Sequence, residues 1–177
     1  QGVVGLLTAR LLAEHPLGQL LTVDPSASRR ERSEAMGATP VSSVSDLQRL
    51  DGFGAAATGD SSTPGEPDRA DLVYELTGRP NVLNDAIDCT GFSGRIVVGS
   101  WYGTKTAPID LGGRFHRSRL QIRSSQVSTV DPSLRGRWTK DRRMSVVLDL
   151  LNDLCPRQLI TDRFGLEESP HAYEQLA

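Results

Sequence analysis

Two glycines and one aspartate near the start of the chain have the types and spacing of a phosphate-binding turn. Gly2 and Gly5 match the last two glycines of G-x-G-x-x-G and open an apolar segment, and Asp24 follows the next apolar run. A helix that begins at such a turn presents free N–H groups and the positive end of its dipole, which together attract a pyrophosphate. Gly2 would let the backbone approach that group closely, and Gly5 would let the helix pack tightly on the sheet.

Asp24 matches the acid that follows a dinucleotide-binding turn by about twenty residues. It ends a short apolar run at residues 20–24, which predicts a buried strand. A carboxylate at that strand end accepts hydrogen bonds from the ribose of NAD and repels the 2′-phosphate of NADP. The alternative is an aspartate that only caps the following helix. The order turn, helix, strand and acid favours NAD binding.

The start of the chain departs from the full fingerprint. The first glycine would stand just before Gln1, and no strand leads into the turn. A Rossmann half needs that strand. We therefore expect an internal piece of a larger enzyme, truncated at the N-terminal first strand of the fold and lacking sequence at both ends.

The rest of the chain alternates between strand and helix patterns. Apolar runs bounded by turn residues predict strands at residues 20–24, 40–41, 71–76, 95–99 and 120–123. Helical spacing of apolar residues predicts helices at residues 2–14, 81–89 and 144–154, and a capping box with a terminal glycine predicts one at residues 28–37. This alternation predicts an α/β fold over residues 1–177, a Rossmann-type, doubly wound parallel sheet with right-handed crossovers.

Three details of this pattern can be compared directly with a structure. Ser28 and Glu31 have the spacing of a capping box at the start of the second helix. Residues 51–69 have no apolar period and are rich in small and polar residues, so we expect a flexible loop. The apolar residues of the last helix are expected to face the core: Val147, Leu148, Leu151 and Leu154.

Composition is that of a soluble globular protein. The net charge of −2 provides no bulk attraction for nucleic acid or a membrane surface, and no apolar run approaches a membrane span. The arginine-rich stretch at residues 114–123 is interpreted as a solvated rim, with a nucleic-acid patch or a contact to an anionic substrate group as alternatives. The two cysteines form no disulfide framework, and a cytoplasmic location is expected.

Several stretches together resemble the coenzyme-binding domain of zinc-type alcohol dehydrogenases, the medium-chain dehydrogenase/reductase family. The resemblance rests on residues 1–5, 22–24, 71–78 and 94–99, in the expected order, and on the tail at 168–174. That tail looks like the family's closing segment, so residues 165–177 would begin the return to the catalytic domain. The resemblance implies a Rossmann domain that orients NAD for hydride transfer.

The resemblance also assigns roles along the cofactor. Arg29 would lean over the adenosine ribose, while Thr77 and Gly78 would line the cofactor groove. Val98, Gly99 and Ser100 would meet the nicotinamide side, and Ser125 would offer a carbonyl or N–H group to the carboxamide. The candidate cofactor-binding residues are therefore Gly2, Val3, Val4, Gly5, Asp24, Arg29, Thr77, Gly78, Val98, Gly99, Ser100 and Ser125.

The chain departs from the family in its metal ligands. The family holds its catalytic zinc through Cys, His and acidic residues of a separate domain. The three histidines here, His15, His116 and His171, lie in different segments, and the cysteines form no ligand motif. We predict no metal site in this chain and expect zinc and the catalytic residues only in the complete enzyme.

The resemblance thus implies an NAD-dependent alcohol or polyol dehydrogenase that acts on a small alcohol or carbonyl substrate. This fragment alone is expected to be inactive. Two alternatives remain open: a zinc-independent quinone or enone reductase of the same superfamily, and a non-catalytic NAD-sensing module. Trp101 and Tyr102, after the strand at 95–99, would form a loop at the cofactor cleft, a contact between subunits of a homo-oligomer, or an ordinary packed pair.

Overall fold

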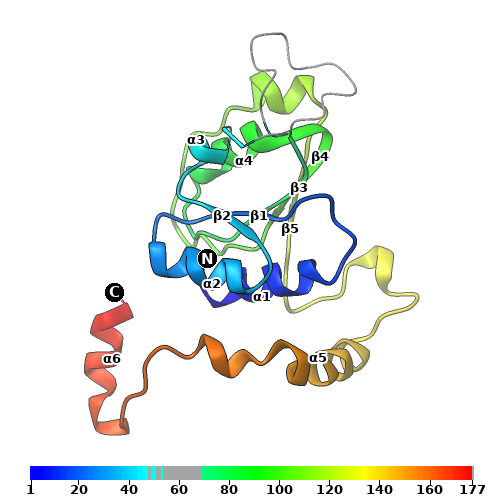
Figure 1. Cartoon of the computed structure of the whole chain (residues 1–177). Coiled ribbons are helices and arrows are strands. Elements are labelled where there is room, and N and C mark those ends of the chain that lie inside the picture. Colours follow the sequence, from blue (N-terminus) through cyan, green and yellow to red (C-terminus); the bar gives the residue numbers. More distant parts are fainter. Residues whose placement is uncertain (48, 51–52, 54–68, 177) are drawn as a thin grey trace. The chain divides into compact units, whose positions relative to one another are not determined.

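The computed structural model describes residues 1–47, 49–50, 53 and 69–176, which form two compact units. The first unit spans Gln1–Lys140 and contains every strand of the described residues, and the second spans Asp141–Ala177. The first unit combines helices with parallel strands, which confirms the predicted α/β class (Figure 1).

The first half of this unit forms a two-stranded sheet. It contains α1 (Val3–Ala13), β1 (Leu21–Val23), α2 (Ala27–Ala35), β2 (Thr39–Val41) and the short α3 (Val44–Leu47). Strands β1 and β2 pair in parallel, with Val23 opposite Val41. Helix α2 connects the two strands, so this half is a βαβ unit.

The predicted capping box at the start of α2 is wrong. The helix begins at Ala27 with Ser26 as its N-cap, so Ser28 lies inside the first turn. The Ser28 hydroxyl lies 3.1 Å from the Ser26 hydroxyl instead of capping a backbone N–H. The end of the helix follows the prediction, because Gly37 adopts a φ of 91°, which favours glycine.

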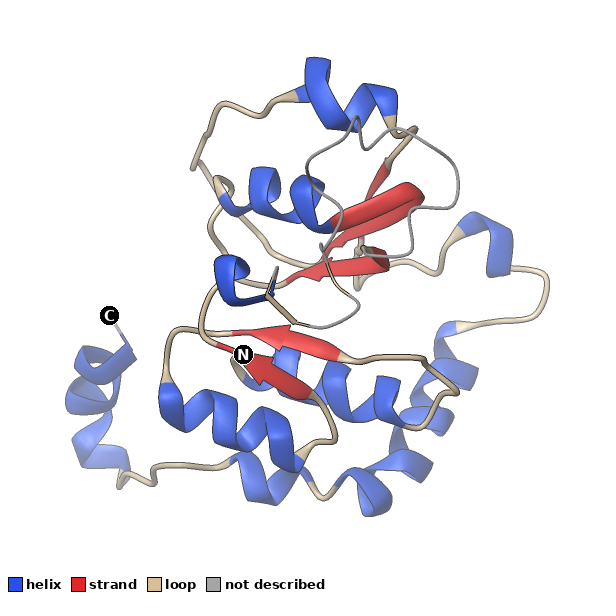
Figure 2. Ribbon diagram, turned by 45° about the horizontal axis from the view of Figure 1, so that its top comes forward, coloured by secondary structure: helices blue, strands red, loops and turns tan. Residues whose placement is uncertain are grey.

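The second half of the unit forms a three-stranded sheet. It contains β3 (Ala70–Glu75), α4 (Val82–Cys89), β4 (Thr90–Val98), the π-helical turn η1 (Leu111–Phe115), β5 (Gln121–Ser124) and η2 (Pro132–Leu134). The strands lie in the order β3-β4-β5, all parallel, with β5 at the edge as predicted (Figure 2). In the usual doubly wound order 3-2-1-4-5-6, the two-stranded sheet corresponds to strands 3-2 and the three-stranded sheet to strands 4-5-6.

Two apolar clusters form the core of the unit. One contains Val41, Leu47, Phe53 and Cys89 and therefore joins residues that flank both sheets. The other lies between α4 and the three-stranded sheet and contains Ala86, Ile87, Ile96 and Leu120.

Phe53, within the loop predicted at residues 51–69, is buried. Residues 51–69 have no apolar period, but Phe53 is only 4% exposed and packs in the first cluster. Arg69, at the other end of the segment, donates to the carbonyl of Asp88. The remainder of the predicted flexible loop lies outside the described residues.

The second unit is mostly helical. Its elements are α5 (Lys140–Leu154), η3 (Pro156–Leu159), η4 (Leu166–Glu168) and α6 (Ser169–Leu176). The expectation that α5 packs its apolar residues inward is wrong for Val147, Leu148 and Leu151, which are exposed, and Leu154 is half-buried. An amphipathic pattern identifies the apolar face of a helix but provides no surface to cover it. Among the described residues, no helix is long and apolar enough to cross a membrane.

Candidate functional site

Asp24 lies directly after β1, at the carboxyl end of the strand, and is only 4% exposed. Its Oδ2 accepts a hydrogen bond from the N-terminal ammonium group of Gln1, and its Oδ1 accepts one from the N–H of Ser26 at 2.8 Å. Burial alone would raise the pKa of Asp24, but these hydrogen bonds outweigh burial and lower it. The structure therefore brings the predicted acid and the start of the glycine turn together, with the acid ionised at neutral pH.

The start of α1 is open above Gly2. Gly2 is the N-cap, no side chain caps the helix, and a Cβ at this position would meet nothing within 4 Å. Val3 and Val4, in the first turn, are both exposed. The first N–H groups of a helix lack partners within the helix, so this end has the space and the donors for an anionic group.

Gly5 is buried and lies against the side chain of Gln1. A Cβ on Gly5 would lie 2.6 Å from Oε1 of Gln1. Its lack of a side chain makes room for the Gln1 side chain, which is itself mostly buried. The contact is local to the turn.

Two arginines lie beside Asp24 and make different contacts. Arg29 Nη1 is 3.9 Å from Oδ2 of Asp24, and its side chain is 55% exposed. Arg30 Nη1 instead donates to the carbonyl oxygens of Asp24, at 2.9 Å, and Pro25, at 2.8 Å. The sequence analysis did not single out Arg30, because an arginine on a polar helix has no pattern that distinguishes a backbone contact from a solvated side chain.

The second group of candidate residues follows the carboxyl ends of β3, β4 and β5. Gly78 has a φ of 71°, which favours glycine, and its N–H donates to the Ser100 hydroxyl at 2.8 Å. The N–H of Gly99 donates to the carbonyl of Glu75 at 3.0 Å. The turn after β3 and the loop after β4 are therefore joined directly.

Ser125 is tied to the same edge. Its N–H donates to the carbonyl of Val98 at 2.7 Å and extends the pairing of β5 with β4. A contact from Ser125 to a carboxamide would therefore use its carbonyl or hydroxyl oxygen rather than this N–H. A side chain on Gly99 would meet Leu76, with 2.5 Å between its Cβ and Cδ2 of Leu76.

Glu75 is a buried residue of this edge that sequence reasoning missed. It ends β3 and is only 2% exposed. Its Oε1 accepts from the backbone N–H of Thr77 at 2.7 Å and from the Thr77 hydroxyl at 2.5 Å. The hydroxyl of Tyr102 donates to Oε2. The signal was a charged residue within the predicted strand at residues 71–76, to which the sequence analysis gave no role of its own.

The ionisation of this pair follows from its contacts. Burial alone would raise the pKa of Glu75, but the hydrogen bonds from Thr77 and Tyr102 outweigh burial and lower it. Burial and the neighbouring carboxylate raise the pKa of Tyr102. At neutral pH the pair is therefore a carboxylate that accepts from a neutral phenol.

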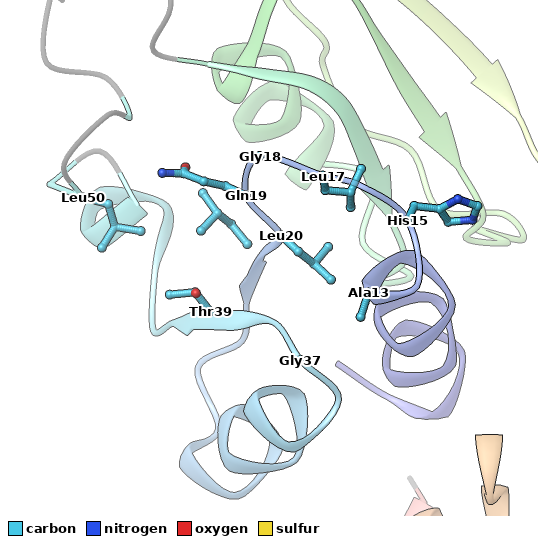
Figure 3. Close-up of a pocket in the computed structure, with 10 residues that line it drawn as sticks. Ala13, His15, Leu17, Gly18, Gln19, Leu20, Gly37, Thr39 and Leu50 are labelled. Carbon is cyan, nitrogen blue, oxygen red and sulfur yellow. The ribbon is translucent and has the colours of Figure 1, made fainter. Parts of the chain in front are cut away.

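A pocket of about 550 Å³ lies elsewhere in the first unit (Figure 3). It is bordered by the end of α1, the amino ends of β1 and β2, and Leu50. Asp24 lies at the opposite, carboxyl end of β1. In open α/β sheets, ligands bind at the carboxyl ends of the strands, so this pocket is separate from the candidate edge.

Among the described residues, metal ligands are not clustered at the candidate edge or at the pocket. In the described part of the chain, no group of three or more His, Cys, Asp and Glu side chains is close enough to hold a metal ion. The residues present therefore do not fit a zinc site.

Comparison with known families agrees with this geometry. The family model for zinc-binding dehydrogenases matches residues 3–146. The chain belongs to the zinc-binding dehydrogenase family. The match includes both parallel sheets and every candidate cofactor-binding residue except Gly2. No curated protein sequence matches the chain.

Solved structures show the same fold. An alcohol dehydrogenase from Thermus sp. ATN1 superposes with a TM-score of 0.72 at 22% identity, over 99% of this chain and 45% of that one. A short chain alcohol dehydrogenase from E. coli CFT073, complexed with NADH, gives a TM-score of 0.71 at 17% identity, over 99% of this chain and 46% of that one.

A third structure carries a different cofactor. A zinc-binding dehydrogenase from Sinorhizobium meliloti 1021, bound to NADP, gives a TM-score of 0.58 at 21% identity, over 91% of this chain and 41% of that one. At such identities the likeness establishes the Rossmann-like dehydrogenase fold alone. The present chain spans less than half the length of each of these three proteins.

Proposed function

We propose that this chain is the NAD-binding part of a zinc-type alcohol or polyol dehydrogenase. The observation that carries the proposal is the meeting of an uncapped glycine turn with a buried, ionised aspartate. Asp24 accepts from the backbone of Gln1, directly before the open N-terminus of α1. Phosphates favour such helix ends, and a strand-end carboxylate favours a free ribose.

Each candidate group has a specific task in this proposal. The first N–H groups of α1, at Val3, Val4 and Gly5, would donate to the pyrophosphate across the open space at Gly2. Asp24 would accept from the adenosine ribose, and Arg29 would lie beside that ribose.

The other end of the cofactor would lie along the second group. Thr77 and Gly78, after β3, and Val98, Gly99 and Ser100, around the end of β4, would line the nicotinamide half. When bound, NAD supplies the acceptor for a hydride from an alcohol. The domain would hold the nicotinamide in one orientation. Asp24 would repel the additional 2′-phosphate of NADP.

The substrate is proposed to be a small alcohol or its carbonyl product. The residues described here do not form a zinc site, so the proposal assigns zinc ligands and catalytic residues to none of them. A zinc-independent enone or quinone reductase of the same superfamily would share this domain. Those enzymes usually prefer NADP, and the ionised Asp24 favours NAD instead.

Titration calorimetry on the full-length protein tests the proposal. NAD and ADP-ribose, which lacks the nicotinamide, should both bind, and NADP should bind at least about tenfold more weakly, as expected for a carboxylate facing a phosphate. Equal affinity for NAD and NADP would contradict the NAD assignment. Absence of binding by all three ligands would overturn the proposed function.

A further inference from the structure

Glu75 is a buried carboxylate without a cationic partner. Among the described residues, no Lys or Arg forms an ion pair with it, although it is only 2% exposed. Buried charges are costly unless hydrogen bonds satisfy them. Here the N–H and hydroxyl of Thr77 and the hydroxyl of Tyr102 satisfy this carboxylate.

These donors come from two different segments. Thr77 belongs to the turn after β3, and Tyr102 belongs to the loop that follows β4. Each carboxylate oxygen of Glu75 binds a different segment, because Oε1 accepts from Thr77 and Oε2 accepts from Tyr102. A single side chain therefore links the two segments.

Further bonds join the same two segments around Gly78. Its N–H donates to the Ser100 hydroxyl at 2.8 Å, and its carbonyl accepts from Nζ of Lys105 at 3.1 Å. Lys105 is exposed and Ser100 is half-buried, whereas Glu75 is buried. Hydrogen bonds of a charged, buried group are the stronger ones, so the link through Glu75 dominates.

We propose that Glu75 is a positioning residue that holds the turn after β3 and the loop after β4 at a fixed separation through Thr77 and Tyr102. This inference rests on the proposed function, in which these two segments receive the nicotinamide half of NAD. Glu75 itself is too buried to contact the cofactor. Its effect is to fix the backbone around Gly78 and Ser100 before the cofactor binds, so that binding does not have to order these loops.

The deciding experiment compares two ligands on one variant. Tyr102→Phe removes the hydrogen bond by which Glu75 links the two segments and keeps the ring. In calorimetry on the full-length protein, this change should weaken NAD binding about five- to tenfold, in the range of one hydrogen bond to a charged group. ADP-ribose, which lacks the nicotinamide, should keep its affinity within about twofold.

Two further variants serve as controls. Tyr74→Phe removes a hydroxyl from β3 that bonds to no described residue, and it should leave both affinities unchanged. Glu75→Gln keeps a carbonyl oxygen that can accept from one of the two segments, so its NAD affinity should lie between those of Glu75→Ala and the parent. If Glu75→Ala fails to fold, Tyr102→Phe and Glu75→Gln still decide the question.

The outcomes separate the two proposals. Selective loss of NAD affinity with retained ADP-ribose affinity supports positioning by Glu75. Equal weakening of both ligands, or no change in either, overturns it while the proposed function stands. If the parent protein binds neither ligand, the proposed function fails and this inference fails with it.

Discussion

Arg29 Nη1 lies 3.9 Å from Oδ2 of Asp24, and the arginine is more than half exposed while the aspartate is almost fully buried. The same oxygen accepts from the backbone of Gln1. The carboxylate is therefore held by the terminal ammonium of Gln1 and the N–H of Ser26, and the contact with Arg29 is longer and more exposed. A ligand that needs the acid would find it already oriented.

Replacing Asp24 should relax the choice of cofactor. Asp24→Ala removes the acceptor for the ribose and the repulsion of a 2′-phosphate, leaving Arg29 to attract that phosphate. We expect the preference for NAD over NADP to fall by about 1–3 kcal/mol in the full-length protein. Calorimetry with both cofactors measures this change, and an unaltered ratio would show that Asp24 only shapes the turn after β1.

Replacing Gly2 should block NAD without unfolding the domain. A Cβ at Gly2 meets nothing in the protein, and its φ of −76° is accessible to any residue. Gly2→Val should therefore lower the melting temperature only by a few degrees, roughly the effect of 1 kcal/mol. The added side chain would occupy the space proposed for the pyrophosphate, so NAD binding should fall below detection.

Gly18 provides the matched control for that variant. A Cβ at Gly18 would also meet nothing within 4 Å, and this loop residue precedes β1 at its amino end. Gly18→Val should leave NAD affinity unchanged. If Gly2→Val bound NAD as the parent does, the glycine turn would have only a structural role.

The charge of Glu75 should make stability depend on pH at the acid side. The pKa of Glu75 is lowered in the folded chain. The contribution of Glu75 to the free energy of unfolding is therefore fully present above its pKa in the unfolded chain, about 4.3. It is lost as the pH falls through its pKa in the folded chain. At pH 7, Glu75→Gln should cost about 1.5–3 kcal/mol, and this difference should shrink in urea titrations at pH 4 and 3. A difference that stays constant with pH would assign the cost to packing.

Tyr102 should make the stability of the folded chain depend on pH on the alkaline side, where stability falls as the pH rises. Its pKa is raised in the folded chain. Its contribution is therefore present below the unfolded pKa of about 10 and is lost as the pH rises toward the folded pKa. Urea titrations between pH 8 and 11 should show a smaller alkaline loss for Tyr102→Phe than for the parent. A loss of the same size in both proteins would exclude this tyrosine as the cause.

The two cysteines should differ sharply in reactivity. Burial raises the pKa of the Cys89 thiol to about 11, and the side chain lies in the core, whereas Cys155 is exposed. Because the thiolate is the reactive form, a disulfide reagent at pH 8 should modify Cys155 rapidly and Cys89 only on unfolding. Cys155→Ser should abolish the fast phase. Two fast phases in the parent would mean that the first core cluster opens readily.

Local patterns were enough to predict most elements of the first unit. The apolar run before Asp24 became β1, and the apolar segment after Gly2 became α1. A short buried strand and an amphipathic helix depend on residues next to one another, so their patterns are visible in the sequence. The spacing of the dinucleotide-binding fingerprint predicted that Asp24 would follow this strand at its carboxyl end.

Contacts between distant residues were decided only by the tertiary structure. The link from Glu75 to Tyr102 spans two strands, and the burial of Phe53 depends on neighbours from α3 and α4. No period or spacing records such contacts, because they depend on how the parallel strands bring their carboxyl ends to one edge.

The sequence by itself therefore determined the α/β class, the strand-end position of Asp24 and the glycine turn, since each depends on residues close together in the chain. The tertiary structure decided which polar groups are buried and what satisfies them. It selected Arg30 rather than Arg29 for the backbone of Asp24, and it gave Glu75 its partners. The physical reason is that the cost of burying a charge depends on the donors that surround it, and only the folded chain brings those donors together.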